Sequence, residues 1–65
     1  MNREQMENSW SEVKASVRAK FSKLTDSDIE KIEGKMERLV GRLQRRYGYP
    51  KEKAEKEADE LISRL

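Results

Sequence analysis

The sequence predicts an all-α protein, a compact bundle of three to four short helices. Apolar residues recur at steps of three and four along nearly the whole chain, which is the period of helices with one buried face. Four residues typical of helix ends, Thr25, Gly34, Gly48 and Pro50, divide this pattern into segments. The chain has 65 residues, of which 34% are apolar and 43% charged, so a thin core must lie beneath a heavily charged surface. That length suits one domain, residues 1–65.

The first expected helix carries a single apolar stripe with steps of four, three, four, four and three: Met6, Trp10, Val13, Val17, Phe21 and Leu24. Such spacing keeps these side chains on one face, which predicts one amphipathic helix. Two capping boxes compete for its start, Asn2 with Gln5 and Ser9 with Glu12. We expect Trp10 to belong to the core, and the alternative is a half-exposed anchor for a partner protein.

Thr25 is a favourable N-cap for the next helix, with Asp26 and Asp28 in the first turn, where negative charge is stabilised. The same residues resemble the start of a calcium loop, and Glu37 falls at its twelfth position. However, Lys31 stands at the sixth position, where that loop needs glycine. We therefore expect capping and no metal site.

Gly34 leaves two interpretations of the middle of the chain. The apolar period runs unbroken from Ile29 to Tyr47, which allows one long helix containing Gly34, although an interior glycine costs roughly 1 kcal/mol relative to alanine. The alternative is a short helix over 26–33, a bend, and a longer helix over 35–47. The second interpretation suits a compact domain better, because one long rod would have no partner of equal length.

Gly48 and Pro50 predict the end of this helix and the start of the last one, which runs to Leu65. The turn between them joins two helices, as in helix-turn-helix modules. The last helix presents an expected buried face of Ala54, Ala58, Leu61, Ile62 and Leu65.

Five basic residues form what we call the basic stripe: Lys35, Arg38, Arg42, Arg45 and Arg46. On a helix they fall within an arc of about 100°, beside the apolar stripe of Met36, Leu39, Val40, Leu43 and Tyr47. The basic stripe is the best candidate for contacts to phosphates or to an acidic partner. The alternative is a solvated face, or one paired with acidic residues of the same chain. We favour this alternative, because residues 25–34 carry four acidic and one basic side chain.

Composition argues against an enzyme. The chain contains no histidine and no cysteine, which removes the commonest general base and the best nucleophile. No serine lies in a nucleophile-elbow motif, and the three glycines spaced by seven do not form a phosphate loop. We expect no catalytic residue, no cofactor and no bound metal.

Composition also limits location and partners. Without cysteine there is no disulfide scaffold, and no apolar run resembles a signal peptide or a membrane span. We expect a bacterial cytoplasmic protein that acts as a monomer and does not engage membranes. The net charge of +2 is small for a strong nucleic-acid binder.

Five short segments carry a family resemblance: Leu24-Thr25-Asp26, Ile32-Glu33-Gly34-Lys35, Leu39-Val40-Gly41, Arg46-Tyr47-Gly48-Tyr49 and Ala54-Glu55. Together they resemble the CsbD-like family of small bacterial general stress-response proteins. The resemblance implies two helical hairpins packed roughly orthogonally, an arrangement often grouped with SAM-domain-like folds. It also implies induction under stress and no defined biochemical activity.

These observations predict a non-enzymatic stress-response protein that acts by binding or protection. The competing hypothesis is a nucleic-acid-binding module that uses the basic helix face around residues 35–46. The two differ in salt dependence, because phosphate contacts weaken steeply as salt rises, whereas apolar capture of a protein does not.

Overall fold

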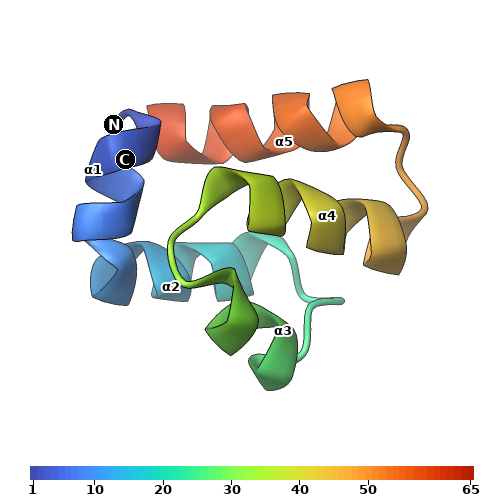
Figure 1. The fold of residues 1–65 in the computed structure, drawn as a ribbon, viewed down its shortest axis with the longest axis horizontal. Coiled ribbons are helices and arrows are strands. Elements are labelled where there is room, and N and C mark those ends of the chain that lie inside the picture. Colours follow the sequence, from blue (N-terminus) through green and yellow to red (C-terminus); the bar gives the residue numbers. More distant parts are fainter.

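The computed structural model describes all 65 residues and contains five helices and no strand. In chain order they are α1 (Arg3–Asn8), α2 (Trp10–Lys20), α3 (Asp26–Ile32), α4 (Met36–Tyr47) and α5 (Lys51–Ser63). Figure 1 shows α4 beside α5, α1 across one end and α3 at the edge away from α5, and α2 packs against α5 as well as against α1 and α3. The all-α prediction is confirmed. The expected number of three to four helices is wrong, because the first expected helix is divided in two.

The division falls at Ser9, which has φ −111° and ψ 28°. The Asn2 and Gln5 capping box forms and begins α1, with the Gln5 N–H 2.8 Å from Asn2 Oδ1. The Ser9 side chain makes no capping hydrogen bond, so the second predicted box is not used. Figure 1 shows α1 turning sharply away from α2 at this point.

A segment distant in sequence packs against the bend. The backbone of Gly34 lies close to the bend at Ser9. A Cβ added at Gly34 would be only 2.8 Å from Glu7 Cα and 3.2 Å from Trp10 Cβ. The apolar stripe continues through the bend, since Met6 and Val13 are both fully buried. The spacing of apolar residues therefore contains no sign of the break.

Gly34 also separates α3 from α4. Glu33 and Gly34 both adopt positive φ, 51° and 75°, in the left-handed region that reverses the chain after α3. Lys35 is then extended and precedes α4 as its N-cap. Of the two interpretations of this region, the short helix followed by a bend and a longer helix is confirmed.

A single core of 15 buried residues draws on all five helices and includes Leu24 in the loop after α2. It contains most residues of the predicted apolar stripes. Trp10 and Tyr47 are partly buried against the core. The prediction that Leu65 is buried is wrong: it is 48% exposed, because α5 ends at Ser63 before another turn can return the chain to the core.

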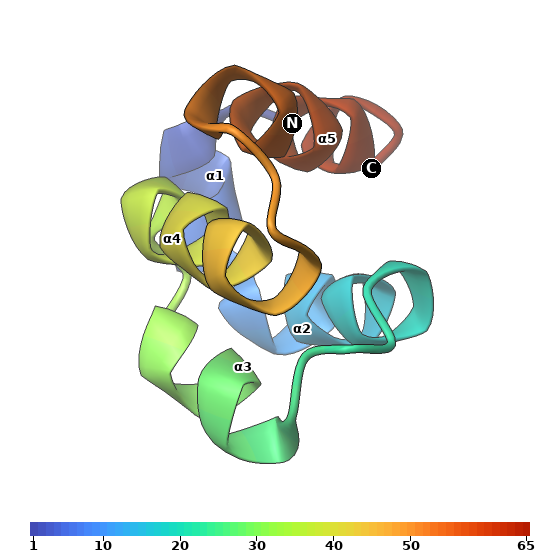
Figure 2. The same cartoon turned by 90° about the vertical axis from the view of Figure 1, so that its right-hand side faces the viewer.

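The turn after α4 brings α5 back alongside it. Gly48 has φ 68° and donates its N–H to Gln44 O at 3.0 Å, which ends α4. In both views α4 and α5 run side by side in opposite directions, a helical hairpin (Figures 1 and 2). The two helices of a DNA-binding helix-turn-helix instead cross at a wide angle, so this turn does not have that geometry.

Candidate anion-binding site

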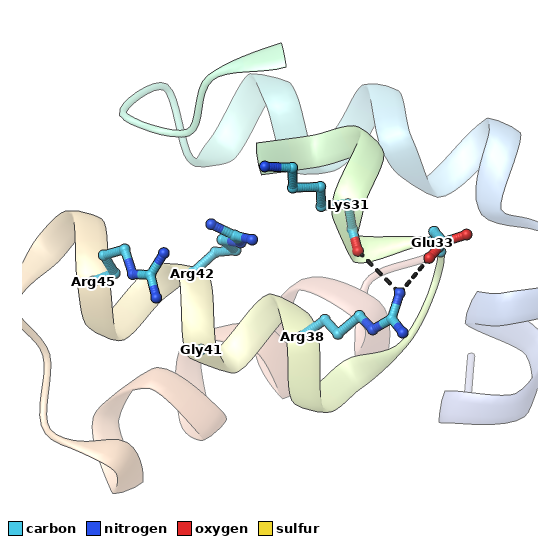
Figure 3. A pocket seen from close by; sticks show the side chains of 6 residues that line it. All are labelled: Lys31, Glu33, Arg38, Gly41, Arg42 and Arg45. Atoms are coloured by element: carbon cyan, nitrogen blue, oxygen red, sulfur yellow. Dashed lines mark hydrogen bonds and ion pairs between the residues drawn. The ribbon is translucent and has the colours of Figure 1, made fainter. Parts of the chain in front are cut away.

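The structure brings three of the five basic-stripe residues to one surface pocket of about 430 Å³. Arg38, Arg42 and Arg45 line it from α4, together with Gly41, while Lys31 and Glu33 line it from α3 and the bend that follows (Figure 3). We call this the α3–α4 pocket. Lys35 and Arg46, the remaining residues of the basic stripe, are not part of its lining.

Arg46 and Arg42 both bind one buried carboxylate, that of Asp28. Arg46 Nε lies 2.7 Å from Asp28 Oδ2, and its Nη2 lies 3.1 Å from Oδ1. Arg42 Nη1 approaches Oδ1 at 3.2 Å. The Asp28 residue is only 2% exposed, so two guanidinium groups neutralise a charge that burial would otherwise make very unfavourable.

The same carboxylate closes the first turn of α3. The Thr25 N–H donates to Asp28 Oδ2 at 3.0 Å, and the Asp28 N–H donates to Thr25 Oγ1 at 3.1 Å. This reciprocal capping box confirms Thr25 as the N-cap and the capping interpretation of the Asp26–Asp28 segment. Asp28 thus joins the start of α3 to the second half of α4.

Hydrogen bonds account for the protonation behaviour of this cluster. The Arg46 guanidinium holds the pKa of Asp28 well below its usual range, with further lowering by Thr25, and these effects outweigh the opposing effect of burial. The same hydrogen bond raises the pKa of Arg46. Asp28 is therefore ionised at neutral pH.

Arg38 and Lys35 also have intramolecular partners. Arg38 Nη1 donates to the Lys31 carbonyl oxygen at 3.2 Å and is bonded to the Glu33 carboxylate, as the dashed lines in Figure 3 show. Lys35 Nζ lies 3.0 Å from Glu7 Oε1, which links the start of α4 to α1. Both pairs are at the surface, where such contacts contribute little to stability.

The Lys31 ammonium and the Arg45 guanidinium make no ion pair. The lining of the α3–α4 pocket contains four basic side chains and one acidic side chain, Glu33, which leaves a net charge of +3. The alternative from the sequence, that the basic stripe pairs with acidic residues of the same chain, thus holds for Arg38 and Arg42 in this pocket. It does not describe Arg45.

The sequence did not predict that Asp28 is a buried carboxylate shared by Arg42 and Arg46. It also did not predict that Lys31, Glu33 and Gly41 line the pocket. One feature of the sequence indicated such a shared acceptor. Arg42 and Arg46 are one helical turn apart, a spacing that presents two guanidinium groups to a single acceptor on a neighbouring element. Nothing in the sequence singled out Asp28 from the other acidic residues as that acceptor.

No group of three or more histidine, cysteine, aspartate or glutamate side chains is arranged to hold a metal ion. None of the five helices is long and apolar enough to cross a membrane.

Comparison with known proteins places the chain in a family. The CsbD-like family profile matches residues 4–56. A UPF0337 protein of Pectobacterium atrosepticum is 51% identical over 57 residues, covering 88% of this chain and 83% of the relative. A UPF0337 protein of Protochlamydia amoebophila is 49% identical with coverage of 88% and 86%, and UPF0337 protein YjbJ of Escherichia coli K12 is 47% identical with coverage of 88% and 83%. No solved structure gives a significant match, so the SAM-domain-like arrangement stays a prediction. The match across most of its length shows that the chain belongs to the CsbD-like family.

Proposed function

We propose that this protein is a non-enzymatic bacterial stress-response protein that acts by binding an anionic partner at the α3–α4 pocket. Membership of the CsbD-like family supports the stress-response part of the proposal. Absence of histidine and cysteine from the chain supports a binding role over catalysis. We further propose that residues 1–65 act as one domain, since one core draws on all five helices, and that the protein is a cytoplasmic monomer.

The net charge of +3 on one open pocket is the observation on which the binding proposal depends. Two of its arginines are already held in place, Arg42 by Asp28 and Arg38 by Glu33 and the Lys31 carbonyl. Prepositioned groups lose less conformational entropy when a ligand binds. Lys31 and Arg45, which make no ion pair, are available to complete the contacts.

Chemical-shift mapping at low salt tests this proposal, with duplex DNA, RNA and polyglutamate as three polyanion probes. We expect the backbone amides of Lys31, Gly41 and Arg45 to shift most with at least one probe. A double variant, Lys31→Ala with Arg45→Ala, should lose the effect. The matched control is Lys56→Ala with Arg64→Ala, which removes the same charge from exposed positions near and on α5. If the pocket amides keep their chemical shifts with every anion, tripolyphosphate included, the proposal is wrong.

Nucleic-acid binding is the second candidate function, and the pairing of the basic stripe makes its expected salt dependence smaller. All five residues on phosphates would give a slope of log affinity against log salt of about −3 to −5. Arg46 and Arg42 already neutralise the buried carboxylate of Asp28, whereas Arg38 pairs only with the exposed Glu33. Lys31, Arg38 and Arg45 therefore remain as the main charges for phosphates to neutralise. At roughly −0.9 per contact, we then expect a slope of about −2 to −3 for duplex DNA.

Fluorescence anisotropy of labelled duplex DNA at several salt concentrations measures that slope. The double variant of Lys31 and Arg45 should reduce its magnitude by about 2. A slope that is unchanged in this variant would contradict nucleic-acid binding at the α3–α4 pocket.

A further inference from the structure

We infer that the α3–α4 pocket binds an inorganic oligophosphate, a short chain of phosphoryl groups that carries neither bases nor apolar groups. This inference rests on the proposed function and names its ligand class. It follows from three features of the pocket: its lining, the geometry of its donors and the glycine among its lining residues.

No hydrophobic side chain lines the pocket. Sites for small organic ligands are mostly apolar, and proteins that bind single-stranded nucleic acids supply aromatic rings on which bases stack. The aromatic residues at the end of α4 and just after it, Tyr47 and Tyr49, stack on each other, with ring centroids 5.1 Å apart. A lysine ammonium also lies over each of these rings. The pocket therefore offers charge without a surface for a base.

The donors suit phosphoryl oxygens. Guanidinium groups present planar pairs of N–H donors that match phosphate geometry, and three of them line this pocket. Figure 3 shows Arg38, Arg42 and Arg45 spread along α4, with Lys31 facing them from α3. Such a row of donors is better matched by several linked phosphoryl groups than by a single orthophosphate.

Gly41 lines the pocket from α4, next to Arg42 (Figure 3). It is inside a helix, where glycine is less favourable than alanine, and a Cβ at this position would meet nothing within 4 Å. Packing and backbone conformation thus give no reason for glycine here. We attribute it to the ligand: without a side chain, the phosphoryl chain can lie directly against the helix.

Glu33 places one carboxylate at the edge of the pocket, bonded to Arg38. It repels an anion and occupies one of the donors that an anion needs. Glu33→Gln should therefore strengthen oligophosphate binding, an effect that a general loss of fold would not produce.

Isothermal titration calorimetry with tripolyphosphate, pyrophosphate and orthophosphate tests the inference. We expect affinity to rise with chain length, to fall about tenfold or more in the Lys31→Ala and Arg45→Ala double variant, and to change less than about twofold in the Lys56→Ala and Arg64→Ala control. The Glu33→Gln variant should bind tripolyphosphate about two- to fivefold more tightly, because it removes the one carboxylate that repels the anion. Equal affinity for orthophosphate and tripolyphosphate, or equal losses in the double variant and its control, would refute it.

Gly41→Ala separates binding from folding. The added methyl group should weaken tripolyphosphate binding while raising the melting temperature by about 4–8 °C. Unchanged binding in this variant would remove Gly41 from the site and contradict direct contact with the helix.

Competition distinguishes the two levels of the proposal. If DNA, RNA or polyglutamate shifts the pocket amides but tripolyphosphate neither binds nor displaces that probe, the ligand class is wrong and anion binding stands. If no anion binds, both are wrong.

Discussion

Arg46 and Asp28, eighteen residues apart in sequence, are joined by two hydrogen bonds of 2.7 and 3.1 Å. Asp28 is buried, whereas the Arg46 side chain is 40% exposed, so a partly exposed guanidinium group neutralises a buried carboxylate. It also fixes the second half of α4 against the first turn of α3. Part of the basic stripe is thus structural, and only the remainder is available for the partner that we propose.

Asp28→Asn should destabilise the protein by about 1.5–3 kcal/mol at pH 7, the range found for hydrogen bonds to charged groups. Its effect should depend on pH. The pKa of Asp28 in the folded protein lies well below its ordinary value of 3.8, so the unfolded chain takes up the proton first as pH falls. The stabilisation is therefore complete above about pH 5 and is lost progressively below about pH 4.

Urea unfolding of both proteins between pH 7 and pH 2.5 measures this difference. The stability difference between wild type and Asp28→Asn should shrink as pH falls through the acid range. The control is Asp26→Asn, whose carboxylate pairs with Arg18 at 3.0 Å at an exposed position and should contribute at most about 1 kcal/mol. A difference that is constant with pH would show that the charge of Asp28 does not stabilise the fold.

The three glycines spaced by seven should respond differently to alanine. Gly34→Ala should be the most destabilising, by about 2–4 kcal/mol, because its φ is positive and its Cβ would clash with the Glu7 backbone. Gly48→Ala should cost about 1 kcal/mol, because φ is positive but the space is open. Gly41→Ala should stabilise by about 1 kcal/mol. Thermal unfolding of the three variants gives the order, and a Gly34→Ala protein as stable as Gly48→Ala would disprove the close approach.

Leu43→Ala should cost about 2–5 kcal/mol, because Leu43 is fully buried on α4 and its removal leaves a cavity. That is a large fraction of the stability expected for a domain of this size. Leu65→Ala is the matched control: Leu65 is 48% exposed and should change stability by less than about 0.5 kcal/mol. Chemical denaturation monitored by circular dichroism compares them, and equal effects would contradict the core assignment.

Tyr47→Phe should cost about 0.5–1.5 kcal/mol. The Tyr47 hydroxyl accepts the Lys23 backbone N–H at 3.2 Å and so connects the end of α4 to the loop after α2. Tyr49→Phe removes a hydroxyl that makes no hydrogen bond within the protein and should be nearly neutral. The difference in urea midpoint between the two variants is the measurement, and identical midpoints would mean that the Lys23 contact contributes nothing.

Elements with strong local signals were predictable. The apolar stripes of α2, α4 and α5 identified most of the core, because a 3.6-residue period places side chains of known spacing on one face. Thr25 was recognised as a cap and Gly48 as a helix end, because both act through their own backbone and nearest neighbours.

Features that depend on distant contacts were not predictable. The bend at Ser9 lies against Gly34, a contact between distant segments that the apolar spacing does not record. Leu65 was placed in the core for a different reason: the apolar period continues past Ser63, where α5 ends.

The basic stripe illustrates the same division. Its arc on α4 is determined by sequence alone, because positions along one helix have a fixed angular relation. Which arginines are paired and which are available was decided only by tertiary structure, since α3 carries Asp28 to Arg42 and Arg46 and leaves Arg45 without an ion pair. Pairing of charges depends on the distance between side chains in space, and that distance is set by how the helices pack.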